Sequence, residues 1–320
     1  MSPETGRPGP GSTLHLGIDL GGTNIKWVVL AWDGAGWTTA GTGSAPTHAE
    51  EGERAVVDRL ATTASAAMAA HGQVASVGVG VPGLYDPEAG TTEFLVNFPG
   101  GWHGVPVVGP LRQTLGLPIA LINDARAFGL AELRLGAAQG VGSMIGLTLG
   151  TGVGGVVAID GHVRQGYKGR AGELGHQTID PDGPWCNCGN RGCVEAFCRA
   201  DQIAIACGTT TVEAAVTAAR AGDAQAIRGL ADTGRYLGIG LANMIVAINP
   251  DRVVLGGGVA AAGELLLTPI RDEIARRVHV TAWDHIEVVT ARLGTYAGAI
   301  GAGIHGAERA TSVRQEVATA

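Results

Sequence analysis

Four residues in and near one glycine-rich stretch carry side chains that bind soft metal ions. The segment CNCGNRGC contains Cys186, Cys188 and Cys193, and His176 stands ten residues before the first of them. One imidazole and three thiolates form a closed tetrahedral set, which suits zinc and leaves no coordination position for a reactant. The pattern therefore predicts a structural zinc site. The alternative is a loop of free thiols with His176 in the protein interior.

Two carboxylates flank these metal-binding residues. Glu173 lies three positions before His176, and Glu195 lies two positions after Cys193. If zinc orders this segment, both carboxylates are held in place, and carboxylates that accept pairs of hydrogen bonds suit sugar hydroxyls. Paired carboxylates are also the machinery of a glycosidase. We rank the glycosidase low, because it leaves the glycine turns described next without a role.

The first glycine turn follows a short apolar run that ends at Asp19. Gly21 and Gly22 can adopt positive φ, and without a Cβ they let backbone N–H groups approach an anion closely. Thr23 adds a hydroxyl, and Asp19 can hold a divalent cation through water. Together they predict a site for the phosphates of a nucleotide with Mg²⁺. The alternative is an ordinary hairpin turn, in which Gly-Gly is common.

Two further glycine clusters follow strand-like runs. Gly150, Thr151 and Gly152 precede the β-like run VVAI, so they do not form a dinucleotide fingerprint, which needs a helix at that point. We expect a second phosphate-binding hairpin there. The third cluster ends a strand and opens a helix, where it either lies against an adenosine or is a plain helix turn; it comprises Gly256, Gly257 and Gly258.

Asn123 and Asp124 stand where a buried strand ends and a helix begins. Ligands of α/β sheets bind beyond the carboxyl ends of the strands. An aspartate there can accept a proton from a substrate hydroxyl while the neighbouring asparagine orients that substrate. Taken alone, the pair fits a simpler role, in which Asp124 caps the helix. The surrounding motifs favour the catalytic role.

Strand and helix patterns alternate along the chain, which indicates an α/β architecture. A strand, a glycine turn and a second strand occur near residue 20 and again near residue 150, each at the start of an α/β block. This repeat predicts two related lobes with a cleft between them. Residues 84–104 are rich in Gly, Pro and Thr and predict a loop.

The bulk composition narrows the class of protein. The 320 residues are 45% hydrophobic and 16% charged, which is typical of a folded protein, and the net charge is −7. A protein that grips nucleic acid non-specifically usually carries a positive charge. No apolar run is long enough for a transmembrane helix, and the N-terminus does not resemble a signal peptide. We therefore expect no nucleic-acid or membrane partner and a cytoplasmic location.

Taken together, these motifs resemble the ROK family of sugar kinases, which includes bacterial glucokinases. The resemblance runs from about residue 14 to residue 305. Its most specific part is the zinc motif with the glutamate that follows it. The matching segments are Asp19–Thr23, Gly80–Gly83, Asn97 followed by Trp102, Asn123–Asp124, Leu149–Gly152, Glu173–His176, Cys186–Glu195 and Gly256–Gly258.

The resemblance implies an actin-like, hexokinase-type fold of two ribonuclease-H-like lobes that close over ATP–Mg²⁺ and a sugar. It implies a small lobe over 14–122 on which a helix at about 296–310 packs back, and a large lobe over 123–295 with the zinc loop at 173–195. Residues 1–13 contain Pro and Gly but no apolar core, and we expect them to form a disordered tail. The resemblance also implies a homodimer or a tetramer. Asp124 would be the base for the 6-OH of a hexose. The implied sugar contacts are Gly83, Asn97, Asn123, Asp124, Glu173, His176 and Glu195.

Two departures from the family pattern leave the substrate open. The loop Asn97-Phe-Pro-Gly-Gly-Trp102 is one residue longer than usual, and Cys198-Arg199-Ala200 replaces a familiar Ala-Ser-Gly. Glucose is the first expectation; an amino sugar, an N-acetylhexosamine, fructose or a cyclitol is an alternative. The family also contains repressors, so a non-catalytic sugar-sensing protein is a second alternative. Repressors of the family carry a helix-turn-helix domain of several dozen residues before the first glycine turn. That turn follows Asp19 here, so we expect no such domain.

Overall fold

The computed structural model describes residue 6, residues 8–95 and residues 98–319, with side chains described as far as residue 312. Contacts divide the chain into two compact units. The first runs to Leu135 and includes Gln165–Ala171 and the chain from Leu293; the second comprises Gly136–Arg164 and Gly172–Arg292. Each unit is described by itself.

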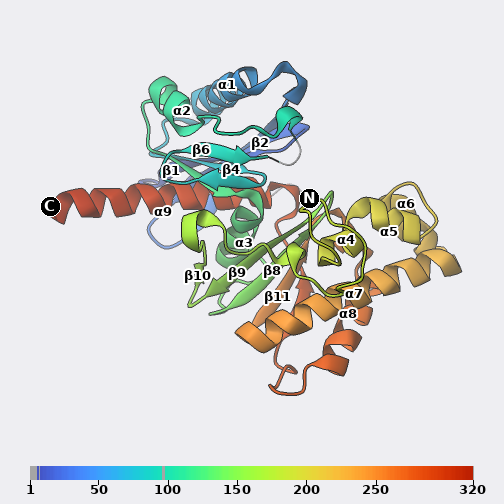
Figure 1. Cartoon of the computed structure of the whole chain (residues 1–320). Helices are drawn as coiled ribbons and strands as arrows, with labels where there is room; N and C mark the ends of the chain where they lie inside the picture. The colour runs from blue at the N-terminus through green and yellow to red at the C-terminus, as the bar shows by residue number, and fades with distance from the viewer. Residues whose placement is uncertain (1–5, 7, 96–97, 320) are drawn as a thin grey trace. The chain divides into compact units, whose positions relative to one another are not determined.

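The first unit is built on a five-stranded sheet (Figure 1). Its order is β3-β2-β1-β4-β7, with β1–β3 antiparallel and β1, β4 and β7 parallel. The strands are β1 (Thr13–Leu20), β2 (Asn24–Trp32), β3 (Trp37–Pro46), β4 (Val77–Val81) and β7 (Ile119–Asn123). A small hairpin adds β5 (Leu84–Asp86) and β6 (Thr91–Phe94).

Two groups of helices pack on this sheet. The apolar side chains of α1 (Glu53–His71) and α2 (Val108–Leu115) share a core with β1 and β4. The helices α3 (Asp124–Leu135) and α9 (Ala297–Thr319) pack on one another, and α9 also lies against β1 and β4. Short 3-10 turns cover Ala49–Glu51, Pro99–Gly101, Tyr167–Gly169 and Gly294–Tyr296.

Glycines let α9 approach the sheet backbone to backbone. A Cβ on Gly17 of β1 would lie 1.8 Å from the Ala299 carbonyl oxygen, and one on Gly78 of β4 would lie 1.7 Å from that of Ala302. A Cβ on Gly301 would lie 1.7 Å from the Ala127 carbonyl oxygen in α3. Any side chain at these positions would push the helix away from its seat.

The second unit repeats the same strand arrangement. Its sheet has the order β10-β9-β8-β11-β12, in which β8–β10 are antiparallel and β8, β11 and β12 are parallel. The strands are β8 (Met144–Leu149), β9 (Val153–Ile159), β10 (His162–Val163), β11 (Arg252–Gly256) and β12 (Glu287–Thr290). The predicted strand, glycine turn and strand therefore begins the sheet of each unit.

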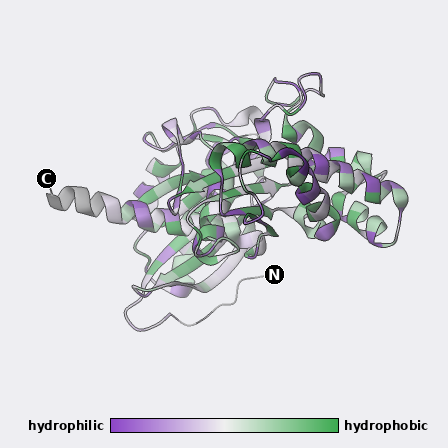
Figure 2. Cartoon of the chain, turned by 90° about the horizontal axis from the view of Figure 1, so that it is seen from below, coloured by the Kyte–Doolittle hydropathy of each residue, from purple (hydrophilic) through white to green (hydrophobic). Residues whose placement is uncertain are grey.

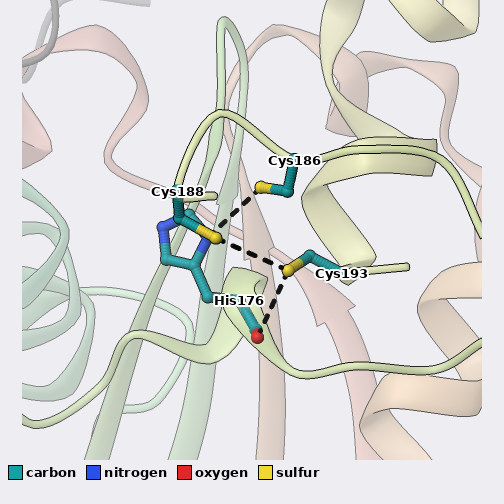
Figure 3. Close-up of side chains that lie close together, drawn as sticks. All are labelled: His176, Cys186, Cys188 and Cys193. Atoms are coloured by element: carbon teal, nitrogen blue, oxygen red, sulfur yellow. Dashed lines mark hydrogen bonds between the residues drawn. The ribbon is translucent and has the colours of Figure 1, made fainter. Parts of the chain in front are cut away.

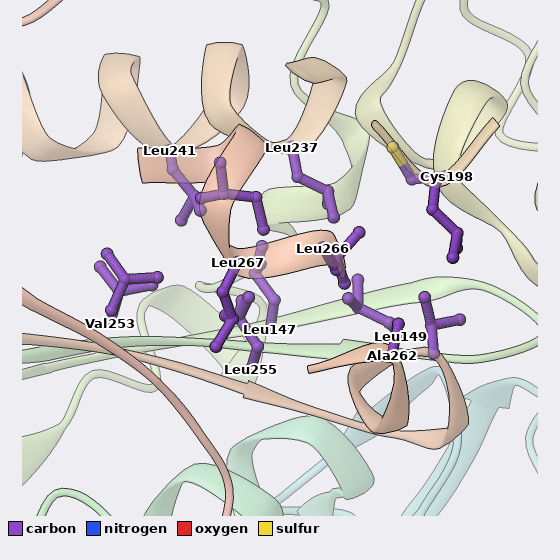
Figure 4. Packing of buried hydrophobic residues seen from close by; sticks show 14 of the residues in the cluster. Leu147, Leu149, Cys198, Leu237, Leu241, Val253, Leu255, Ala262, Leu266 and Leu267 are labelled. Carbon is purple, nitrogen blue, oxygen red and sulfur yellow. The ribbon is translucent and has the colours of Figure 1, made fainter. Parts of the chain in front are cut away.

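Helices and turns complete the second unit. The helices are α4 (Val194–Cys198), α5 (Ala200–Ala206), α6 (Val212–Arg220), α7 (Ala224–Ile248) and α8 (Glu264–Arg277), and 3-10 turns cover Leu174–His176 and Gly258–Ala262. Leucines of β8 and β11 pack against Leu237 and Leu241 of α7 and Leu266 and Leu267 of α8 (Figure 4). The strands are largely apolar, and polar residues gather on helix faces and loops (Figure 2).

The structure corrects three expectations about elements. Residues 84–104 are not a plain loop, because they contain the β5–β6 hairpin. The strand β3 was missed, because its glycines and serine lower β-propensity; Gly41 and Gly43 leave space for the rings of His71 and Trp27. The first unit begins its sheet at Thr13 and extends to Leu135, beyond the expected boundary at 122, because α3 packs on α9.

Candidate active site

The junction of β7 and α3 carries the predicted base. The side chain of Asn123, which is 4% exposed, accepts the N–H groups of Ala125 (3.0 Å) and Arg126 (3.2 Å) through Oδ1. These are the bonds of an N-cap. Asp124 is the first residue of the helix, and its Oδ1 accepts the Ala125 N–H at 2.8 Å. The capping role therefore falls mainly to Asn123, not to Asp124.

Asn123 also fixes the chain at Gly83. Its Nδ2 donates to the Gly83 carbonyl at 3.1 Å. Gly83 has φ +87°, and a Cβ there would lie 2.3 Å from the Phe94 carbonyl oxygen, so only glycine fits without strain. The structure thus brings together Gly83, Asn123 and Asp124. The predicted sugar contact Asn97 lies outside the described residues.

Asp19 is the second-last residue of β1 and is half-buried. Burial raises the pKa of its carboxyl from the ordinary 3.8 to about 6, and the charge of Lys26, its partner across the β1–β2 pair, opposes that rise. A Cβ on Gly298 of α9 would lie 2.8 Å from this carboxyl. A glycine in α9 therefore leaves the space in which Asp19 sits.

The turn after Asp19 is fixed by a residue that the sequence did not single out. The Thr47 hydroxyl donates to the Gly21 carbonyl at 2.6 Å, and the Thr47 N–H donates to the Thr23 carbonyl at 2.8 Å. Gly21 does not use a left-handed φ, contrary to the reason we gave for it. A Cβ at Gly21 would instead lie 2.9 Å from the Asn24 carbonyl oxygen.

In the second unit the four predicted zinc-binding residues converge. One ligand atom from each of His176, Cys186, Cys188 and Cys193 lies within 4.8 Å of all the others (Figure 3). The Cys186 Sγ is 3.6 Å from the His176 Nδ1, and the sulfurs of Cys188 and Cys193 are 3.7 Å apart. None of these cysteines forms a disulfide.

These distances match the edges of a coordination tetrahedron. With Zn–S of about 2.3 Å and Zn–N of about 2.0 Å, tetrahedral ligands lie roughly 3.5 to 3.8 Å apart. The loop folds back on itself at Gly189 and Gly192, both with left-handed φ. A Cβ on Gly192 would lie 1.5 Å from the Asp180 carbonyl oxygen. The residues present therefore fit a single tetrahedral ion.

The two predicted sugar carboxylates beside this cluster have different surroundings. Glu173 is exposed, and its Oε2 lies 3.9 Å from the His176 Nε2, the ring nitrogen that does not face Cys186. Glu195, in the first turn of α4, accepts the Val153 N–H at 2.9 Å through Oε2. Its other oxygen lies 3.6 Å from the Cys186 sulfur. Glu195 therefore joins the cysteine loop to the β8–β9 turn.

A cavity of about 350 Å³ opens beside that turn. Gly150, Thr151 and Gly258 line it, so the second and third glycine clusters meet around one space. Ala200, which the sequence analysis singled out as a departure from the family pattern, also lines the cavity. Residues that the sequence analysis missed complete the wall: Asp201, Thr210, Thr211, Val212, Glu213 and Val259. The sequence offered one signal for this part of the wall, a threonine at the start of a helix. Thr211 caps α6 by accepting the Ala214 N–H.

Three other predicted nucleotide-binding glycines do not line this cavity. Gly256 is buried at the end of β11. A Cβ on Gly257, which has φ +85°, would lie 2.1 Å from the Leu149 carbonyl oxygen. A Cβ on Gly152 would lie 2.6 Å from the Glu195 Oε2. Close packing against the Leu149 backbone is thus the structural reason for glycine at 257, and the closeness of the Glu195 carboxylate is the reason at 152.

Comparison with known proteins assigns the chain to a family. The ROK family profile matches residues 15–306. The chain belongs to the ROK family. This ROK protein is 34% identical over 317 residues to the glucokinase of Halalkalibacterium halodurans. The alignment covers 90% of this chain and 93% of that glucokinase.

Two solved ROK structures are similar over nearly the whole chain. The hexokinase from Thermus thermophilus has a TM-score of 0.80 and 35% identity, covering 94% of this chain and 100% of that one. The glucokinase from Streptomyces griseus, solved with glucose and AMPPNP, has a TM-score of 0.78 and 31% identity, covering 92% and 99%. The predictions of a ROK protein and of an α/β, hexokinase-type fold are confirmed.

Proposed function

We propose that this ROK protein is an ATP-dependent hexose kinase whose first-choice substrate is glucose. The observation that carries the proposal is the β7–α3 junction, where Asn123 caps the helix and Asp124 stands at the strand end. The glucokinase and hexokinase relatives support the same activity. An amino sugar, an N-acetylhexosamine, fructose or a cyclitol is the alternative substrate.

The reaction asks the protein mainly for positioning and charge neutralisation. Asp124 would accept the proton of the sugar 6-OH as that oxygen attacks the γ-phosphorus. Asn123 and Gly83 would orient the sugar. Glu173, Glu195 and the Nε2 of His176 would bind sugar hydroxyls.

The nucleotide would enter the cavity of the second unit. Its wall offers the backbone of Gly150, Thr151 and Gly258 and the hydroxyls of Thr210 and Thr211. Asp19 and the turn at Gly21–Thr23 would serve the phosphates and Mg²⁺. A half-buried carboxylate oxygen suits Mg²⁺, and the bound ion would neutralise phosphate charge.

The cluster of His176, Cys186, Cys188 and Cys193 would hold a structural Zn²⁺, as the distances between their ligand atoms support. The ion would order the loop that bears Glu195.

Within the described parts of the chain, no helix is both long and apolar enough to cross a membrane. We further propose that the protein is cytoplasmic and that it forms a homodimer. Sedimentation analysis tests the homodimer.

The test is a coupled ADP-release screen over hexoses, amino sugars and cyclitols, run on wild type and on Asp124→Asn. We expect turnover with glucose, and a loss of about 10²- to 10⁴-fold in kcat for the variant, the usual range for a missing general base. The Asn123 cap is kept in Asp124→Asn, so its Tm should stay close to that of wild type.

Two outcomes would overturn parts of this proposal. Full turnover by a folded Asp124→Asn protein would remove Asp124 as the base. Sugar binding measured by calorimetry without ADP release from any sugar would instead identify a sugar-sensing ROK protein.

A further inference from the structure

The segment Cys193–Asp201 begins at the metal-binding cluster and ends in the wall of the cavity. Cys193 supplies one of the four clustered ligand atoms, while Ala200 and Asp201 line the cavity. The two sites are therefore separated by one short helix, α4, and its flanking residues. A change in the order of the loop reaches the cavity through a continuous stretch of chain.

This segment forms hydrogen bonds to both ends of the β8–β9 turn. At one end Glu195 accepts the Val153 N–H at 2.9 Å, and at the other the Ala200 N–H donates to the Gly150 carbonyl at 2.8 Å. Gly150 itself lines the cavity. The cysteine loop thus holds the turn that we propose faces the nucleotide.

Arg199 adds a side-chain link between the loop and the cavity wall. Its Nε donates to the Asp201 Oδ1 at 2.8 Å, and its Nη1 donates to the Asn187 Oδ1 at 3.3 Å. Asn187 lies between the ligands Cys186 and Cys188. The ion pair has side chains 20% and 59% exposed, so its direct contribution to stability is small.

We propose that Arg199 is a positioning residue that couples ion binding in the four-residue cluster to nucleotide binding in the cavity. The coupling rests on the proposed function, because it requires the cavity to take a nucleotide. By linkage, an ion that raises nucleotide affinity is itself held more tightly when the nucleotide is bound, by the same factor.

The experiment measures Zn²⁺ affinity by competition with a chromophoric chelator, with and without saturating ADP. For wild type we expect ADP to raise Zn²⁺ affinity about tenfold, within the usual range of allosteric coupling. In Arg199→Ala the factor should fall to about threefold. Asn187→Ala, which removes the other end of the link, should lower it similarly.

Arg134→Ala is the matched control. Arg134 pairs with Glu308 at 3.0 Å with side chains 28% and 45% exposed, and it lies in the first unit. Its coupling factor should equal that of wild type. ADP that binds wild type by calorimetry but leaves Zn²⁺ affinity unchanged would overturn the coupling alone, as would an unchanged factor in Arg199→Ala. ADP that fails to bind at all would overturn the proposed function as well.

Discussion

Two aspartates at the carboxyl ends of parallel strands meet different surroundings. Asp124 begins α3, where the helix N-terminus favours a negative charge. Asp19 is half-buried beside Gly298 of α9, and burial raises the pKa of its carboxyl to about 6. The two roles that we propose, proton acceptor for Asp124 and cation ligand for Asp19, therefore fall on carboxylates in different local environments.

Replacing Asp19 with asparagine should stabilise the protein at pH 7. Because the folded pKa exceeds the ordinary 3.8, the folded state binds more protons than the unfolded state between pH 3.8 and about 6. Stability therefore falls as pH rises through that window. The asparagine cannot ionise, so the free energy of unfolding at pH 7 should rise by up to about 3 kcal/mol, at 1.4 kcal/mol per pKa unit.

Urea unfolding at pH 7 and pH 3.5 checks this expectation. The gain of Asp19→Asn should be large at pH 7 and small at pH 3.5, where the wild-type carboxyl is mostly protonated in both states. Equal effects at the two pH values would contradict it. If Asp19 also serves the Mg²⁺–nucleotide, the stabilised variant should lose turnover.

At the scale of elements, glycine sets how closely α9 can pack. Gly17 and Gly78 on the sheet, and Gly301 on the helix, each leave less than 2 Å for a Cβ before a backbone carbonyl oxygen. Backbone atoms cannot move aside as a side chain can. These glycines therefore act through contact distance, not through φ, since none of them is left-handed.

Gly301→Ala should destabilise the protein by about 3 kcal/mol or more, in the range of severe overpacking. The control is Gly109→Ala in α2, an exposed position with no atom within 4 Å of the new Cβ. There alanine should change the free energy of unfolding by less than about 1 kcal/mol, because its gain in helix propensity is offset by Pro110, which disfavours a helical conformation of the residue before it. Thermal unfolding measures the stability change of each variant. If Gly301→Ala were as stable as wild type, α9 would be able to shift away from α3.

The cysteine loop is an element that we expect an ion to hold together. Purified protein should contain one Zn²⁺ per chain by atomic emission, and Cys188→Ala should lose it, because three ligands bind far more weakly than four. Cys198→Ala is the control, since Cys198 is buried outside the cluster and should keep the ion. A stable wild-type protein without metal would contradict the zinc site.

At the scale of the whole molecule, the same sheet appears twice. Each unit has an antiparallel pair around a glycine turn, followed by parallel strands with helical crossovers. The turn at Gly21–Thr23 belongs to the first unit and the turn at Gly150–Gly152 to the second. Segments far apart in sequence build each unit: α9 completes the first, and residues 165–171 join it from the middle of the chain.

Local patterns were enough to predict most of the fold and of the candidate site. The apolar runs predicted β1, β7, β8 and β9, because a buried strand needs continuous apolar residues. The spacing of His176 and the cysteines predicted their convergence, because zinc accepts few ligand sets. They could not predict β3, whose glycines make sense only against the rings of Trp27 and His71.

What the sequence by itself determined is the set of candidate residues: the side chains we propose for a metal, the carboxylate we propose as the proton acceptor, and the glycines at which the chain turns. Only the tertiary structure decided which residue does which job. It made Asn123 the cap of α3, clipped Glu195 to Val153 and brought Thr210–Glu213 to the wall beside Gly150. The physical reason is that motifs act over a few residues, whereas hydrogen bonds and cavities form between segments that only folding brings together.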